Sequence, residues 1–212
     1  MNKEILEEKV YYYTDVIADP KKLVAAIDNL DSSVWGEWMA CSGLEYVYGE
    51  SKDILPRHMR DSDNEEYDYI YNTINDAMHA VARDYAEAMG NTDDPKLFPV
   101  HPIKKYKAGT FMGAHFDQQE GDERLKYSLV MYLNDDYEGG EISFSIRNPE
   151  GVIQGGTPAE DFEVAKQNKS YSFAVKPKAG SVIIFPPSPP YHHTAHLVKS
   201  GFKYMVPQHW IH

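Results

Sequence analysis

A histidine and an aspartate two positions apart, His115 and Asp117, are the residues of this chain best suited to metal chemistry. Side chains alternate between faces along a β-strand, so these two point the same way and Phe116 points into apolar packing on the other face. An imidazole and a carboxylate on one rigid face are two thirds of a 2-His-1-carboxylate triad, which holds Fe(II) and leaves positions open for O2 and a co-substrate. For the pair taken alone, the alternative is a hydrogen-bonded pair at the surface.

The overall composition narrows the class of protein. The chain has 212 residues, 13% of them aromatic, and a formal net charge of −12. This length suits one domain with a sizeable core, and the acidic charge disfavours binding to nucleic acid or to an anionic membrane. A charged N-terminus, no apolar run of about 18 residues and a single cysteine, Cys41, predict no signal peptide, no membrane span and no internal disulfide. We therefore expect a cytoplasmic protein with a buried free thiol.

Two helices are predicted in the first 99 residues. Asp19 followed by Pro20 is typical of a helix start, and this helix is expected to run to about residue 30. A longer helix is predicted from a capping box at Ser62 to a stop at Gly90. Between them an apolar stripe recurs at helical spacing: Tyr67, Ile70, Ile74, Met78, Val81 and Tyr85.

Strands are predicted at residues 10–17 and, once or twice, within residues 34–48. The second of these segments contains Trp35 and Trp38. We interpret both indoles as core residues, with contact to a substrate as the alternative.

From residue 100 the pattern changes to short apolar strands separated by Gly, Pro and Asn, the clearest at residues 127–133 and 181–185. Such a series predicts a barrel or a double-sheet jelly roll. Residues 146–172 are too long for an ordinary connection. They are expected to form a functional loop that carries a helix near residues 159–167.

The order of motifs in the second half is similar to that of a known enzyme family. These motifs are Tyr106, Gly109, His115, Asp117, Tyr132-Leu133-Asn134, Gly139-Gly140-Glu141, Pro177-Lys178-Ala179-Gly180, Phe185, His193, Val198, Gly201 and Lys203. Residues 100–212 thereby resemble the catalytic domain of the Fe(II)- and 2-oxoglutarate-dependent dioxygenases, in particular the prolyl 4-hydroxylase-like branch. The resemblance implies an α+β fold with a double-stranded β-helix core of the jelly-roll or cupin-like type and supporting N-terminal helices. Residues 1–212 would form a single domain, with 1–99 as helix-rich support and 100–212 as the catalytic β core.

Three histidines, His192, His193 and His196, compete for the remaining metal-ligand position. In the family the distal histidine precedes the basic residue that binds 2-oxoglutarate by about ten residues. If Lys203 is that residue, the separation is 10 for His193, 11 for His192 and 7 for His196. The resemblance therefore selects His193, and we interpret the other two as surface residues or neighbours of the site.

The resemblance also assigns residues to the 2-oxoglutarate pocket. Lys203 lies at the start of an apolar strand, where an unpaired ammonium is costly, and the C5 carboxylate of 2-oxoglutarate would be its partner. The Tyr132 hydroxyl would reach the same carboxylate, Tyr106 would line the pocket or face the substrate, and Ile142 would form a wall. The alternatives are a surface lysine and two ordinary core tyrosines.

The reaction implied by the resemblance is hydroxylation of an unactivated C–H bond, with succinate and CO2 as co-products. The expected cofactors are Fe(II), 2-oxoglutarate and O2, and the resemblance is compatible with ascorbate as a further one. A prolyl residue in a peptide or protein is the expected substrate. The alternatives are a free amino acid or other small molecule, or a non-catalytic jelly-roll binding protein. The loop at residues 146–172 is the candidate for a lid.

Overall fold

Two β-sheets that pack face to face form the centre of the structure, a computed structural model of the 212-residue chain. It describes all residues except 32–34, 43–44, 61–62, 119–122, 147–161 and 170. The large sheet has, in spatial order, β1 (Asn2–Glu7), β2 (Val10–Thr14), β12 (Ser181–Phe185), β8 (Leu125–Tyr132), β15 (Phe202–Ile211), β6 (His101–Lys107), β4 (Glu45–Ile54) and β3 (Gly36–Ser42), with β5 (Lys96–Leu97) beside β15. The small sheet has the order β11 (Phe173–Val175), β10 (Ile142–Phe144), β13 (His193–Ala195) and β7 (Met112–His115). A pair of short strands, β9 (Glu138–Gly139) and β14 (Val198–Ser200), completes the described β structure.

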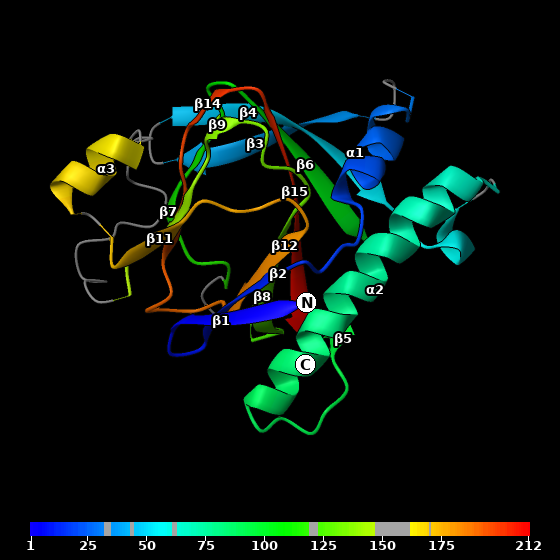
Figure 1. The fold of residues 1–212 in the computed structure, drawn as a ribbon, viewed down its shortest axis with the longest axis horizontal. Coiled ribbons are helices and arrows are strands. Elements are labelled where there is room, and N and C mark those ends of the chain that lie inside the picture. The colour runs from blue at the N-terminus through cyan, green and yellow to red at the C-terminus, as the bar shows by residue number, and fades with distance from the viewer. Residues whose placement is uncertain (32–34, 43–44, 61–62, 119–122, 147–161, 170) are drawn as a thin grey trace.

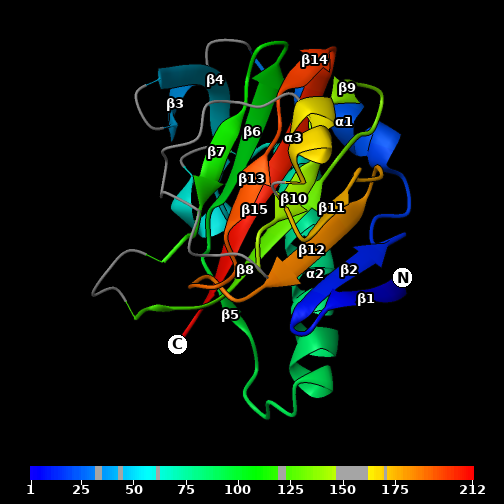
Figure 2. The same ribbon diagram turned by 90° about the vertical axis from the view of Figure 1, so that its left-hand side faces the viewer.

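The helices lie on both sides of these sheets. In Figure 1, α1 (Pro20–Asp28) and α2 (Glu65–Ala88) cover the outer face of the large sheet, and α3 (Phe162–Asn168) lies on the opposite side, beyond the small sheet. Figure 2 looks onto the small sheet, with α2 behind both sheets. A short 3₁₀ turn, Arg57–Met59, precedes α2. Among the helices that the structure describes, none is long and apolar enough to cross a membrane.

Strand β8 shows why the central strands read as almost continuous apolar runs. Leu129 and Met131 pack into the core shared with the helices, whereas Val130 and Tyr132 pack into the core between the sheets. Because both faces are buried, the simple alternation of polar and apolar residues disappears. The predicted α+β architecture with a double-sheet jelly-roll core is confirmed.

The helix boundaries follow the predicted signals with one correction. The Asp19 side chain accepts a hydrogen bond from the backbone N–H of Lys22 at the start of α1, as expected. At α2 the capping residue is Asn64, whose Oδ1 accepts from the Tyr67 N–H at 3.0 Å. The predicted cap, Ser62, lies outside the described residues. A side-chain acceptor directly before the first helical residue satisfies an otherwise unpaired amide, and here Asn64 has that position.

The first half of the chain contributes more than helical support. Strands β1 and β2 form one edge of the large sheet and β3 and β4 form the other. The predicted loop helix is present as α3, although the segment 147–161, on which the lid hypothesis mainly depends, lies outside the described residues.

Candidate active site

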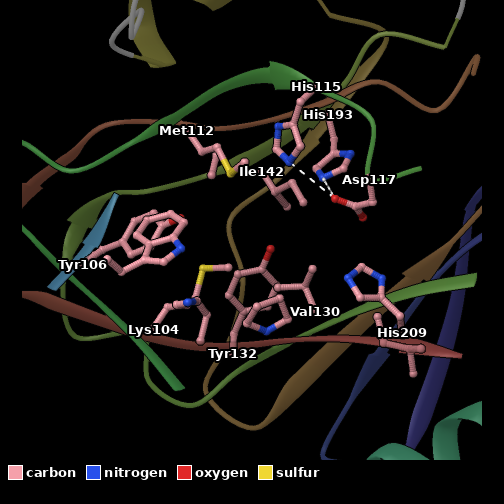
Figure 3. Close-up of a pocket in the computed structure, with 15 residues that line it drawn as sticks. Lys104, Tyr106, Met112, His115, Asp117, Val130, Tyr132, Ile142, His193 and His209 are labelled. Atoms are coloured by element: carbon pink, nitrogen blue, oxygen red, sulfur yellow. Dashed lines mark ion pairs between the residues drawn. The ribbon is translucent and has the colours of Figure 1, made fainter. Parts of the chain in front are cut away.

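Three potential metal ligands converge between the two sheets (Figure 3). His115 ends β7, His193 begins β13, and the two residues are direct partners in the antiparallel pairing of these strands. Asp117 Oδ1 lies 3.6 Å from His115 Nε2 and 3.8 Å from His193 Nε2. One ligand atom from each residue lies within 4.8 Å of the others. The structure therefore brings together the three residues that the sequence predicted as a metal site.

Asp117 does not belong to the same strand as His115, which corrects the expectation that a single strand carries both residues. Strand β7 ends at His115, and Asp117 lies in a bend held by a 2.9 Å hydrogen bond from the Gln118 N–H to the Pro187 carbonyl. The three side chains nevertheless converge, because the bend leaves the Asp117 carboxylate beside both imidazoles. Phe116 points away from the site, and its ring meets the imidazole of His192 edge-on at 5.2 Å.

Hydrogen bonds fix the two imidazoles in the tautomer that metal binding requires. His115 Nδ1 lies 2.8 Å from the Gly113 carbonyl, and His193 Nδ1 lies 3.3 Å from the Tyr191 carbonyl. A carbonyl oxygen can only accept, so each Nδ1 carries the proton. Each Nε2 then presents its lone pair towards Asp117, the arrangement found in metal-bound histidines.

The electrostatics of the three residues fit a divalent metal ion. Burial acts to raise the pKa of Asp117, but the imidazoles of His193 and His115, in their protonated form, outweigh it and hold that pKa well below its usual range. Burial lowers the pKa of His193 to about 4, so this ring is neutral near pH 7. One carboxylate and imidazole lone pairs around one point form the donor set of non-haem Fe(II) sites.

The other two candidate histidines lie elsewhere. His192 packs against Phe116 on the far side of the extended segment. The His196 Nε2 lies 2.7 Å from the Ser143 hydroxyl, and its ring faces Phe162 of α3 at 5.2 Å. Of the three, only His193 lies with the pair at 115 and 117.

A cavity of about 160 Å³ extends from the three ligands between the sheets. The large sheet contributes Tyr106, Tyr132 and Met205 to its walls, and the small sheet contributes Met112, Ile142 and Ala195. Burial raises the pKa of both tyrosines above the ordinary value, so their hydroxyl groups stay protonated and can donate hydrogen bonds. Tyr106, Tyr132 and Ile142 thus line the cavity that contains the candidate metal ligands, and their part in binding 2-oxoglutarate stays a prediction.

Lys203 is fully buried beside this cavity, but it is not among the residues that line it. Its ammonium donates a 2.6 Å hydrogen bond to the Gly140 carbonyl and lies 5.0 Å from the centre of the Tyr132 ring. Burial, reinforced by Lys176, lowers the pKa of Lys203 to about 7. An ammonium with so little solvation is one that a carboxylate partner would stabilise strongly.

Asn134 supports Lys203 in a way that the sequence did not reveal. Its side chain donates to the Phe202 carbonyl at 2.7 Å and accepts from the Tyr204 N–H at 2.8 Å, which holds the backbone on both sides of Lys203. In the sequence, Asn134 belongs to the family motif Tyr132-Leu133-Asn134, but no role at the site was assigned to it. A polar amide directly after a buried strand was the available signal.

Several residues that line the cavity were not predicted as site residues: Lys104, Met112, Met205 and His209. Lys104 lies two positions before Tyr106, and His209 lies six after Lys203, so even spacing along one strand face could have identified both. Trp38 also lines the cavity, with its indole stacked on the Tyr106 ring at 5.3 Å. This position favours the alternative of a substrate-facing Trp38 over a purely structural one.

Gly139 is expected to be essential for the turn that supplies the carbonyl partner of Lys203. It has a positive φ of 71°, and a Cβ added there would lie 2.2 Å from the Leu197 carbonyl oxygen. We expect Gly139→Ala to lower the free energy of unfolding by more than about 3 kcal/mol, or to prevent folding. Gly90 is the matched control, because it has a φ of 68° and a Cβ added there would meet no atom within 4 Å. Gly90→Ala should cost only about 1–2 kcal/mol, and equal losses in urea denaturation would contradict the steric argument.

The chain is similar to known proteins in sequence and in fold. The family model of the 2OG-Fe(II) oxygenase superfamily matches residues 102–212. No curated protein sequence matches the chain. Similar solved structures include a 2OG-Fe(II) oxygenase family oxidoreductase from Burkholderia pseudomallei, with a TM-score of 0.65, 13% identity and coverage of 97% of this chain and 86% of that one.

Two further similar structures are prolyl hydroxylases. One is a viral collagen prolyl hydroxylase from Paramecium Bursaria Chlorella virus-1 in complex with 2OG, with a TM-score of 0.56, 19% identity and coverage of 96% and 95% of the two chains. The other, from Trichoplax adhaerens, is in complex with a hypoxia inducible factor oxygen degradation domain peptide fragment, with a TM-score of 0.60, 12% identity and coverage of 96% and 83%. At these identities the likeness shows a shared fold.

The family match spans just over half of the chain and contains all three residues of the candidate metal site as well as Lys203. The chain belongs to the 2OG-Fe(II) oxygenase superfamily.

Proposed function

We propose that this protein is an Fe(II)- and 2-oxoglutarate-dependent hydroxylase that acts on a prolyl residue in a peptide or protein. The observation that carries the proposal is the convergence of His115, Asp117 and His193 at a cavity between the sheets. Membership of the superfamily implies Fe(II), 2-oxoglutarate and O2 as the metal and co-substrates. The chain is accordingly an oxidoreductase in its general chemistry.

His115, Asp117 and His193 would hold the metal in this proposal, each imidazole through Nε2. When bound, the metal supplies O2 activation coupled to the conversion of 2-oxoglutarate to succinate and CO2. The residues around the metal would bind the co-substrate and exclude water. Lys203 would neutralise the far carboxylate of 2-oxoglutarate, and the Tyr132 hydroxyl would donate to it. The apolar walls, including Ile142, would keep water away from the reacting groups.

A prolyl substrate is supported by the shape and chemistry near Trp38. Its indole lies flat on Tyr106 beside the cavity, and the Lys104 ammonium lies 4.9 Å from the indole ring. A flat aromatic face suits a rigid, apolar pyrrolidine ring. The fold is shared with a prolyl hydroxylase in complex with a peptide fragment, which supports a peptide as the substrate. Ascorbate dependence, a cytoplasmic location and a single-domain organisation of residues 1–212 stay predictions from the sequence.

The test starts with purified protein, Fe(II) and 2-oxoglutarate, with succinate release as the measured quantity. A proline-containing peptide array is then incubated with the same mixture, and mass spectrometry locates any added oxygen atom. We expect succinate release that rises with certain peptides and an oxygen atom on their prolyl residue. Succinate release stimulated only by free amino acids would contradict the proposal of a peptide substrate. The absence of succinate under every condition would contradict the proposal that the protein is an enzyme of this kind.

A further inference from the structure

A second cavity, of about 410 Å³, adjoins the one that contains the candidate metal ligands. We call it the outer cavity. It is lined by Phe98, Pro99, Val100 and Pro102, and by Pro207, Gln208 and His209 of β15. Pro207 and His209 also line the cavity that contains the candidate metal ligands, here called the inner cavity, so the two cavities share these walls.

Two prolines explain why the sheet opens at this place. The pairing of β6 with β15 runs from Phe202 opposite Lys107 to Met205 opposite Lys104. The next same-face positions in this register are Pro207 and Pro102, and neither has an N–H for the ladder.

The buried Gln208 side chain replaces the missing ladder contacts. Its Nε2 donates to the Phe98 carbonyl at 3.0 Å and to the Val100 carbonyl at 3.1 Å. The opening between the strands is therefore a built feature of the fold, in which a buried side chain satisfies the Phe98 and Val100 carbonyls.

The outer cavity continues the face of the sheet that carries the active site. Met205, Pro207 and His209 alternate along β15, so their side chains follow one another on the same side. Figure 3 shows His209 facing Asp117 across the inner cavity. A chain that extends from the candidate metal site past His209 would next meet the outer cavity.

The outer cavity differs in chemistry from the rest of this acidic protein. Among the described residues that line it, none is an aspartate, glutamate, lysine or arginine. Burial lowers the pKa of His209, which keeps this ring neutral near pH 7. The formal net charge of the chain is −12, so an acidic ligand would be repelled over a long range while gaining no cationic partner in this cavity.

We infer that the outer cavity is a substrate subsite that binds an uncharged, apolar residue flanking the prolyl residue to be hydroxylated. This inference rests on the proposed function, because it names the second part of the same substrate. Apolar walls and the absence of a charged partner select for an apolar side chain and against an acidic one.

The first test compares two peptides, acetyl-Gly-Ser-Leu-Pro-Leu-Ser-Gly-amide and the same peptide with aspartate at both leucine positions. Binding to the full chain loaded with Mn(II) and 2-oxoglutarate is measured by calorimetry, so no turnover is needed. We expect the leucine peptide to bind at least about tenfold more tightly. Val100→Lys should reverse this preference, and Val100→Asp should weaken the binding of both peptides. If neither Val100 variant altered the preference for the leucine peptide, the assignment of the outer cavity as a subsite would be wrong.

Ile5→Lys and Ile5→Asp are the matched controls. Ile5 is 61% exposed on β1, at the far edge of the large sheet, and the same charges there should leave the peptide preference unchanged. An equal shift from Ile5→Lys would mean that net charge, and not the outer cavity, sets the preference. Pro99 is exposed at the rim of the outer cavity, so Pro99→Lys provides the same test should the half-buried Val100 variants fold poorly.

A cross-linking experiment separates this inference from the proposed function. One leucine of the first peptide is replaced by p-benzoylphenylalanine, and the residues that it labels are mapped by mass spectrometry. Labelling within residues 98–102 or 207–209 without any prolyl hydroxylation would support the subsite and contradict the prolyl substrate. Hydroxylation without such labelling and without a leucine preference would overturn the subsite alone. If neither peptide binds, both proposals are wrong.

Discussion

Replacing Asp117 with alanine should abolish 2-oxoglutarate turnover and weaken metal binding by more than about 100-fold. The reason is that Asp117 supplies the single carboxylate in a group whose other two members are imidazoles, His115 and His193. Its Oδ1 lies within 3.8 Å of both Nε2 atoms, and among the described residues no further carboxylate belongs to this group. His193→Ala should have a comparable effect, because it removes the ligand that the second strand contributes.

Metal affinity is measured directly by titration with Mn(II), and turnover by succinate release in the presence of Fe(II). His192→Ala is the matched control, since His192 is adjacent in sequence but packs on Phe116, away from the three ligands. This variant should keep metal affinity within about tenfold of the unchanged protein. Melting temperatures of the metal-free proteins show whether each variant is folded. A folded Asp117→Ala protein with normal metal affinity would remove Asp117 from the site.

The parts of the fold that could be predicted are those where local chemistry and tertiary structure agree. The cap at Asp19, the apolar stripe from Ile70 to Tyr85 and the turn at Gly90 each specify a boundary through nearby residues alone. In the first half, strands near β2, β3 and β4 were predicted from the sequence, whereas β1 and the pairing of these strands in the large sheet were not. Their partners lie far away along the chain, as β2 beside β12 shows, and pairing over such distances leaves little trace in a single sequence.

The candidate site shows the same division between local and distant signals. His115 and Asp117 could be identified from their spacing, and His193 from its distance to Lys203 within a family pattern. Trp38, by contrast, reaches the cavity only because β3, β4 and β6 lie side by side in the large sheet. The outer cavity was equally hidden, since it depends on Pro102 and Pro207 meeting across two strands that are about 100 residues apart in sequence.

Lys203→Ala should raise the dissociation constant of 2-oxoglutarate by at least about 30-fold, the loss expected when one partner of a buried charge pair is removed. Two lysines, Lys203 and Lys104, could bind the far carboxylate of 2-oxoglutarate, and they differ in burial. Lys203 is fully buried beside Tyr132, whereas Lys104 is half-buried, lines the cavity and donates to the Ser51 hydroxyl at 3.0 Å. Coulomb attraction is less screened at the buried position, so we assign the carboxylate to Lys203. Lys104→Ala should change the dissociation constant by less than about fivefold, and the reverse result would transfer the role to Lys104.

The affinity for 2-oxoglutarate should also fall as the pH rises through about 7. The carboxylate binds the protonated form of Lys203, and burial lowers the pKa of that group to about 7 in the free protein. Above this pH the protonated fraction decreases, so the dissociation constant should increase towards tenfold per pH unit, until the higher pKa of the complex is reached. Calorimetry with saturating Mn(II) between pH 6 and 9 measures this profile. Lys203→Arg keeps its charge throughout and should give a flat profile, Lys203→Ala should be flat at weak affinity, and Lys104→Ala should keep the original slope. A flat profile for the unchanged protein would contradict the assignment of Lys203.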